Sequence, residues 1–225
     1  MQILATSLLA SLLLGCVNPS APSVTHDGLV AQQNANFGIL YVKPGAVTVA
    51  YDKFVLASCE VTFKRNWLLD QNSARHSPSL QVTEKDMHRI RTTLIQFCND
   101  EFASVLRAAP PYQVIPPDLA DAKTLILRPS IIDLNVAAPD VQRPGLARSF
   151  TTESGEMTLL LELADASTGE VLYRIVDRRR ANRSMQLEWS NSVTNAADAK
   201  RILSRWGNQL RQGLDHVMST EDTAG

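Results

Sequence analysis

The sequence predicts an α+β fold: a two-layer sandwich with two helices packed on one face of a mostly antiparallel sheet of about four to five strands. Two observations lead to this fold class. Several short segments alternate apolar and polar residues, as half-buried strands do. Two longer segments each gather their apolar residues on one helical face, which has to be buried against another layer.

The alternation predicts strands over residues 53–63, 112–115, 124–134, 157–164 and 170–178, and residues 37–42 should pack onto the body before the first of them. Pro129 lacks an N–H, so its strand should be bulged there or lie at an edge. Residues 165–169 have the composition of a hairpin turn. If Asp165 pairs with Glu170, the antiparallel register brings Met157 opposite Arg178.

The helices are predicted from their capping residues and their periodicity. Thr83 and Asp86 approximate a capping box, and Val82 with Met87 fits a hydrophobic staple, so the first helix should begin at Glu84. It should continue to about residue 106, before Pro110-Pro111. Asn195 should cap a second helix that extends to about residue 217. Residues 64–80 are polar, and no element is expected there.

The N-terminus carries the most informative motif. Leu13-Leu14-Gly15-Cys16 closes a short apolar run and resembles a bacterial lipobox. The run is shorter than the ~20 residues that a membrane-spanning helix needs, so residues 1–15 are expected to be a signal peptide that is removed. The resemblance implies that Cys16 becomes acylated. An ordinary secretory signal and a buried N-terminal helix are the alternatives.

Composition then divides the mature chain. Residues 16–36, rich in Pro, Ser, Asn and Gln, are expected to be a lipidated cysteine with a flexible tether. Residues 37–218 should form one domain, and residues 219–225 a disordered tail. The formal net charge of −1 gives no global field that would attract nucleic acid.

The two remaining cysteines are expected to stay reduced. Cys59 lies on the apolar face of the first strand and Cys98 on the apolar face of the first helix, so both should point into the same core. Packed layers stand ~10 Å apart, whereas the Cα atoms of a disulfide usually lie within ~7 Å of each other. A disulfide, which an exported chain with two thiols would allow, is the alternative.

The candidate contact residues lie toward the end of the second hairpin strand and just beyond it. They are a group of basic residues and one aromatic residue: Arg174, Arg178, Arg179, Arg180, Arg183 and Trp189. The loop of residues 135–155 and the segment of residues 182–195 should meet at the same end of the sheet, which would form a rim suited to a partner. The competing interpretation is a solvated strand end neutralised by Glu153 and Glu156, with Trp189 as core or edge packing.

Five stretches resemble a family of uncharacterised Gram-negative lipoproteins, the domain of unknown function 3313. They are Phe63-Lys64-Arg65-Asn66-Trp67, Val82-Thr83-Glu84-Lys85-Asp86-Met87, Leu127-Arg128-Pro129-Ser130-Ile131-Ile132, Ser154-Gly155-Glu156-Met157-Thr158-Leu159 and Trp189-Ser190-Asn191-Ser192-Val193-Thr194-Asn195. The resemblance implies an envelope location and transfers no catalytic or binding residue.

The functional hypothesis is a lipid-anchored, non-enzymatic periplasmic module that binds a protein or an envelope component. Val17, not Asp, follows Cys16, which favours the outer membrane. No nucleophile, metal or phosphate-loop motif is present, so no catalytic residue, cofactor or metal is predicted. The alternatives are a hydrolase or transferase with an unrecognised site, and a homo-oligomeric accessory of an export or envelope complex.

Overall fold

A computed structural model of the chain describes residues 21–32, 36–46, 51–73, 75, 77–78, 81–136, 150–151, 155–180, 188–189 and 192–219. The signal peptide, Cys16 and the C-terminal tail predicted above lie outside these residues.

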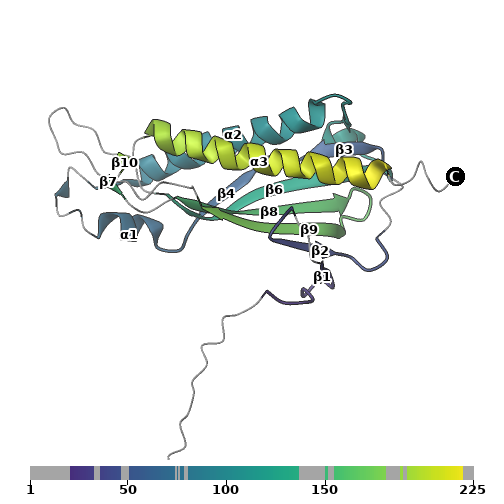
Figure 1. Cartoon of the computed structure of the whole chain (residues 1–225), viewed down its shortest axis with the longest axis horizontal. Helices are drawn as coiled ribbons and strands as arrows, with labels where there is room; N and C mark the ends of the chain where they lie inside the picture. Colours follow the sequence, from purple (N-terminus) through teal and green to yellow (C-terminus); the bar gives the residue numbers. More distant parts are fainter. Residues whose placement is uncertain are drawn as a thin grey trace, which may run out of the picture.

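The described residues form a two-layer α+β sandwich (Figure 1). Its main sheet has eight strands, in the order β1-β2-β9-β8-β6-β3-β5, with β4 paired to β6 beside β3. The predicted sheet of four to five strands was therefore too small. The strands of this sheet are β1 (Val30–Gln32), β2 (Ile39–Val42), β3 (Lys53–Leu56), β4 (Glu60–Phe63), β5 (Gln113–Val114), β6 (Thr124–Asn135), β8 (Glu156–Asp165) and β9 (Val171–Arg180).

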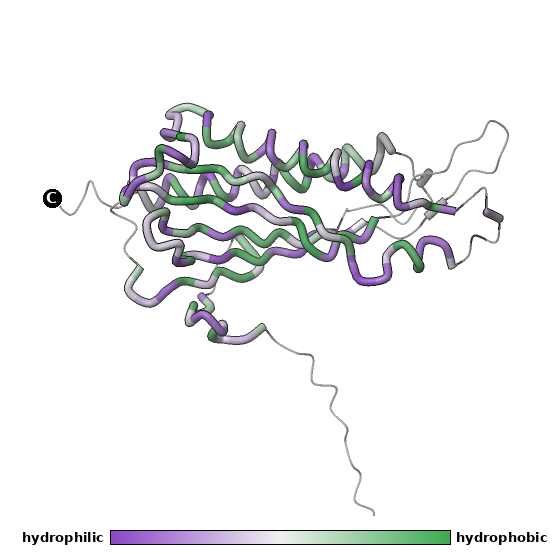
Figure 2. Tube along the Cα trace, turned by 180° about the vertical axis from the view of Figure 1, so that it is seen from behind, coloured by the Kyte–Doolittle hydropathy of each residue, from purple (hydrophilic) through white to green (hydrophobic). Residues whose placement is uncertain are grey.

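Two long helices, α2 (Glu84–Arg107) and α3 (Ser192–Ser219), cover one face of the sheet, as predicted (Figure 1). In the capping box of α2, Thr83 Oγ1 accepts from the N–H of Asp86 at 3.3 Å and the Asp86 carboxylate accepts from the N–H of Thr83 at 3.0 Å. Hydrophobic and hydrophilic residues alternate around both helices (Figure 2). Their apolar sides form one core with the inward residues of β6, β8 and β9.

The opposite face of the sheet carries the alternate residues of the same strands, and we call it the helix-free face. Because successive strand residues point to opposite sides, the neighbours of the core residues Leu161 and Ile175 lie on it. On β8 and β9 these neighbours include Leu160 and Val176. The residues of β6 on the same face include Ile126, Arg128 and Ser130, and all five are half-buried. The helix-free face is thus mixed in character, neither a second core nor fully solvated.

Pro129 lies within a central strand, contrary to the prediction of a bulge or an edge. In an extended strand, residues two apart turn their backbone groups to the same side, and the Leu127 carbonyl accepts from Ala57 N at 2.9 Å. The Pro129 nitrogen therefore faces residues 57–59, where β3 has ended and β4 has not begun. The missing N–H coincides with a gap in the neighbouring ladder.

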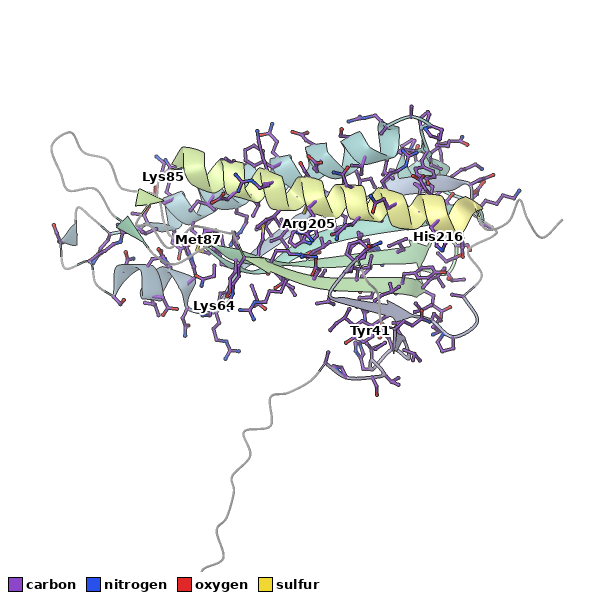
Figure 3. All side chains as sticks on the ribbon, viewed as in Figure 1. Tyr41, Lys64, Lys85, Met87, Arg205 and His216 are labelled. Atoms are coloured by element: carbon purple, nitrogen blue, oxygen red, sulfur yellow. A yellow bond between two sulfur atoms is a disulfide. The ribbon has the colours of Figure 1, made fainter. Side chains whose placement is uncertain are left out.

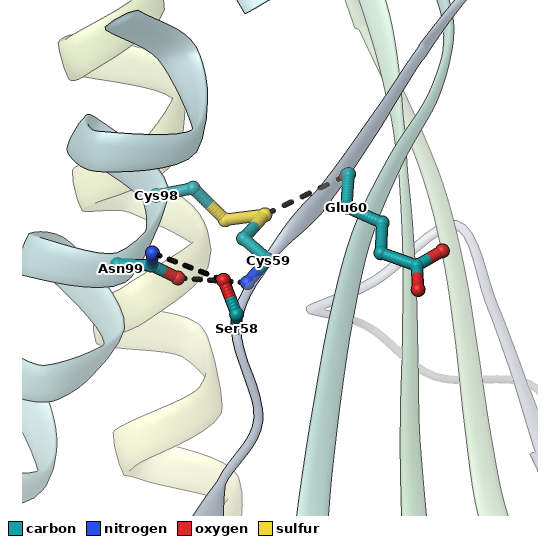
Figure 4. The surroundings of a disulfide bond; sticks show 5 residues. All are labelled: Ser58, Cys59, Glu60, Cys98 and Asn99. Atoms are coloured by element: carbon teal, nitrogen blue, oxygen red, sulfur yellow. Dashed lines mark hydrogen bonds between the residues drawn. A yellow bond between two sulfur atoms is a disulfide. The ribbon is translucent and has the colours of Figure 1, made fainter. Parts of the chain in front are cut away.

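The same gap overturns the prediction that Cys59 and Cys98 stay reduced. They form a disulfide with a Cα–Cα distance of 6.1 Å (Figure 4). The prediction assumed one continuous strand over residues 53–63, but Cys59 lies in the break, where the chain can leave the plane of the sheet toward α2. Its N–H donates to the Asn99 side chain on that helix at 2.7 Å. As predicted, both cysteines belong to the core.

Two segments that were expected to lack structure are ordered. Within the polar stretch of residues 64–80, α1 (Trp67–Asn72) buries Trp67, whose indole donates to the Val136 carbonyl at 2.9 Å. Within the predicted tether, residues 21–32 turn and add β1 to the sheet edge. Leu29 is fully buried there, so the tether is shorter than predicted.

Candidate functional site

Four arginines of the predicted rim, Arg174, Arg178, Arg179 and Arg180, lie on β9, which is paired to β8 along its whole length. The hairpin begins as expected, with Asp165 N donating to the Glu170 carbonyl at 2.9 Å. An irregularity between Leu163 and Ala164 then shifts the register, and Met157 pairs with Arg179 instead of Arg178. A one-residue shift exchanges the faces of every later side chain relative to the partner strand. It therefore decides which arginines share a face with Glu156.

Arg178 and Arg180 share the helix-free face with one carboxylate. The Glu156 side chain accepts from Arg178 at 2.6 Å and from Arg180 at 2.9 Å. The Arg178 hydrogen bond is the main reason that the pKa of Glu156 lies below its usual range, and Glu156 in turn raises the pKa of Arg178. The two arginine side chains remain 59% and 73% exposed. The two guanidinium groups share the Glu156 carboxylate, and the charge of Asp133 also raises the pKa of Arg178.

Arg179 points to the other side, toward the helices. It donates to the Asp177 carboxylate at 2.7 Å, and the same carboxylate accepts from the Trp206 indole of α3 at 2.8 Å. Gly38 N donates to it at 3.2 Å. Asp177 and Trp206 are buried, so this network joins β9, α3 and the approach to β2. Arg179 belongs to the packing of the two layers and is not a free contact residue.

Arg174 is also committed within the molecule. Its guanidinium donates to Asp27 through two nitrogens, at 3.0 and 2.7 Å, and to Glu162 at 2.8 Å. The side chain is only 15% exposed. The hydrogen bonds from Arg174 are the main cause that holds the pKa of Asp27 well below its usual range. Arg174 therefore fixes the N-terminal turn to the helix-free face.

The two long connections meet at the end of the sheet where Arg178 and Arg180 lie. Strand β7 (Phe150–Thr151) pairs antiparallel with β10 (Glu188–Trp189), and Trp189 is opposite Phe150. Glu156, at the start of β8, pairs with Arg180 at the end of β9. The two connections therefore meet at the strand ends where Glu156 and Arg180 lie, as the sequence predicted. The side chain of Trp189, and Arg183 and Glu153 altogether, lie outside the described residues.

Sequence reasoning missed two polar contacts that organise the fold. Asp27 was assigned to a flexible tether, and no local pattern marks it as the partner of Arg174 across 147 residues. Arg211 of α3 donates to the carbonyls of Val105, Ala108 and Pro110, which closes the C-terminal end of α2. The only available signal for Arg211 was its position on a helix predicted to pack beside another helix.

The described residues contain no cluster of three or more His, Cys, Asp or Glu side chains that could hold a metal ion. Among the same residues, no helix is both long enough and apolar enough to cross a membrane. What the site offers chemically is a pair of exposed, always-charged planar donors, a geometry that suits carboxylate or phosphate oxygens.

The fold and the site define an α+β sandwich domain that presents exposed arginines at one end of its helix-free face. The chain belongs to the family described as Protein of unknown function (DUF3313), whose model matches residues 23–210. The resemblance seen in the sequence is thereby confirmed. No curated protein matches the chain.

Three solved structures show distant similarity. The PelC dodecamer from Paraburkholderia phytofirmans is 14% identical, with 74% of this chain and 95% of that chain covered and a TM-score of 0.34. Protein XCC0632 from Xanthomonas campestris, of the DUF330 family, is 14% identical, with 82% and 94% covered and a TM-score of 0.39. A putative neuraminyllactose-binding hemagglutinin homolog from Helicobacter pylori is 7% identical, with 76% and 92% covered and a TM-score of 0.38. At these scores the similarities carry no functional assignment.

Proposed function

We propose that the protein is a lipid-anchored, non-enzymatic module of the bacterial outer membrane that faces the periplasm and binds a protein or another envelope component. The observation that carries this proposal is the motif Leu13-Leu14-Gly15-Cys16 after a short apolar run. Transfer of a diacylglyceryl group to the Cys16 sulfur and acylation of its new amine would bury several chains, each CH₂ contributing about 0.8 kcal/mol. Such an anchor would be effectively permanent.

The Cys59–Cys98 disulfide supports export independently of that motif. Disulfides persist in oxidising compartments such as the periplasm and are rare in the cytosol. This one joins residues that are only 2% and 0% exposed. A bond so deep in the core has to form before or while the two layers pack together. Its formation therefore fits a chain that folds in an oxidising compartment.

Among the described residues, the proposed contact surface consists of Arg178 and Arg180; Arg183 and the Trp189 side chain, which lie outside these residues, stay predicted members of it. Arg174 and Arg179 are engaged by carboxylates and largely shielded. Arg178 and Arg180 are exposed and share a single carboxylate, so a ligand with carboxylate or phosphate oxygens could bind them without breaking the fold.

The lipid anchor is tested by Cys16→Ser in cells. The variant should accumulate as uncleaved precursor, whereas the wild-type protein should give a mature chain that begins at an acylated Cys16. Intact mass and metabolic labelling with palmitate measure both outcomes, and membrane fractionation gives the location. A mature, acyl-free chain that begins at another residue would refute the anchor.

The contact surface is tested by replacing Arg178 and Arg180 with Glu and comparing the partners crosslinked in intact cells. A matched control replaces Arg89 and Arg201, which are similarly exposed and are each paired with one Asp three residues away on a helix. We expect partners to be lost from the first variant and retained by the control, with unchanged circular dichroism in both. Identical partner sets would remove the arginines from the proposal, and mass measurement in detergent would show whether the partner is a second copy of the chain.

A further inference from the structure

The N-terminal turn, residues 23–31, is built against the helix-free face. Within it, Leu29 N donates to Thr25 Oγ1 at 2.9 Å and Ala31 N donates to the Ser23 carbonyl at 2.8 Å. Gly28 adopts a φ of 82°, a left-handed conformation that glycine tolerates without strain. The turn is therefore a closed local unit rather than an extended tether.

Two contacts hold this unit on the face away from the helices. Asp27 pairs with Arg174, whose neighbour Ile175 is part of the helix-side core, so Arg174 must project to the other side. Tyr41 on β2 is opposite Arg174 in the register and is 4% exposed. Figure 3 shows Tyr41 beside β2, below the sheet and away from α2 and α3. Ala31 pairs with Tyr41 and continues the sheet.

The position of this turn sets the length of chain between the anchor and the body. Only residues 17–22 separate Cys16 from Ser23. Seven Cα steps at about 3.3–3.6 Å each span at most ~25 Å. A tether that ran freely to residue 36 would reach about 70 Å by the same measure. An acylated Cys16 therefore keeps the helix-free face close to the lipid surface as long as Asp27 stays bound to Arg174.

The turn also exposes apolar side chains beside the anchor. Val24 and Val30 form a β-bridge and are 53% and 38% exposed. Val30 pairs with Val42, which pairs with Tyr173, so by strand alternation the two valines are on the helix side of the sheet and are not part of the helix-free face. They lie at the edge of the sheet opposite β5.

We infer that residues 23–31 hold the domain at the membrane with its helix-free face toward the lipid and α2 and α3 facing away, because the short tether leaves the body on the side where Asp27 is bound to Arg174. The inference rests on the proposed acylation of Cys16. Arg178 and Arg180 lie on the same face, so the partner contact proposed above would be made at the membrane surface.

The test measures which face of the body is near lipid. With Cys16 acylated and Cys59 bonded to Cys98, a cysteine introduced at Thr62 or Arg201 is the single free thiol. Thr62 is exposed on the helix-free face, because its neighbour Val61 is in the core, and Arg201 is 69% exposed on α3. Each variant, purified from membranes as the acylated protein, carries a fluorophore and is reconstituted in vesicles of phosphatidylethanolamine and phosphatidylglycerol with a spin label on the lipid headgroup.

We expect quenching at position 62 to exceed quenching at position 201 severalfold. The contrast is the ratio of quenching at position 62 to quenching at position 201. Asp27→Ala should reduce it toward unity, because the freed turn lengthens the tether while Arg174 keeps Glu162 as its partner. Val24→Ser with Val30→Ser should leave the contrast unchanged, because the two valines are on the helix side of the sheet. Equal quenching at the two positions in protein of confirmed acylated mass would overturn the docking.

Failure of the anchor itself is recognised separately. If the mature protein carries no acyl chains, the proposed function fails, and coupling of the Cys16 thiol to a maleimide lipid still measures the orientation that the short tether imposes. A label at position 62 that is shielded in native membranes but unquenched in the lipid vesicles would show a protein on this face and refute the lipid contact.

Discussion

Reduction of the Cys59–Cys98 disulfide should destabilise the domain by about 4 kcal/mol. The bond joins cysteines 39 residues apart, and constraining a loop of about 40 residues in the unfolded chain removes about 13 cal/mol/K of entropy. At 25 °C this corresponds to ~4 kcal/mol in the loop-entropy model. Reduction leaves both thiols in place, so no cavity adds to the loss.

The assay is thermal and urea unfolding with and without a reductant that acts on the unfolded chain. For a domain of this size, about 4 kcal/mol lowers the melting temperature by roughly 8–16 °C. The matched control is Cys59→Ala with Cys98→Ala, which should be less stable than wild type and unaffected by reductant. An unchanged wild-type midpoint, together with alkylation of both thiols in denaturant without reductant, would refute the reasoning and restore the reduced state predicted from sequence.

Three further predictions concern contacts that only the structure reveals. Asp177→Ala should cost about 3 kcal/mol in urea unfolding, because the Trp206 indole loses its acceptor in a buried site; an effect below ~1 kcal/mol would contradict it. Gly207→Ala brings a Cβ to 2.9 Å from Val105 Cγ1. The clash between α3 and α2 should outweigh the ~1 kcal/mol gain in helix propensity and lower the melting temperature. A higher melting temperature would show that the helices can separate. Because folding lowers the pKa of Asp27, its charged form stabilises the N-terminal turn fully at pH values above the ordinary pKa of 3.8, and this stabilisation is lost as the pH falls further. Amide exchange in β1 should therefore become faster in acid. In the variant Asp27→Asn it should be faster already at neutral pH.

Local periodicity and capping determined much of the fold from the sequence alone. The apolar faces of α2 and α3, the capping box of Thr83 and Asp86, and the inward positions of Cys59 and Cys98 all follow from residues a few positions apart. Each of these features depends on which side of a helix or strand a residue occupies, and the sequence states that directly. The convergence of the two long connections near the end of β9 also followed, because hairpin geometry fixes where the ends of two strands lie.

Tertiary structure decided distances and registers, which local pattern does not encode. The break between β3 and β4 brought Cys59 within bonding distance of Cys98, and the inward positions change from Phe54 and Leu56 before the break to Cys59 and Val61 after it. One irregularity in the β8–β9 register placed Glu156 on the same face as Arg178 and Arg180 instead of the face of Arg179. Asp27 found Arg174 only because the chain returned to the same sheet far along the sequence. The periodicity of apolar residues in the sequence indicates which face of a helix or strand a residue occupies. The distance between the layers and the register between strands are set by the packing of the whole domain.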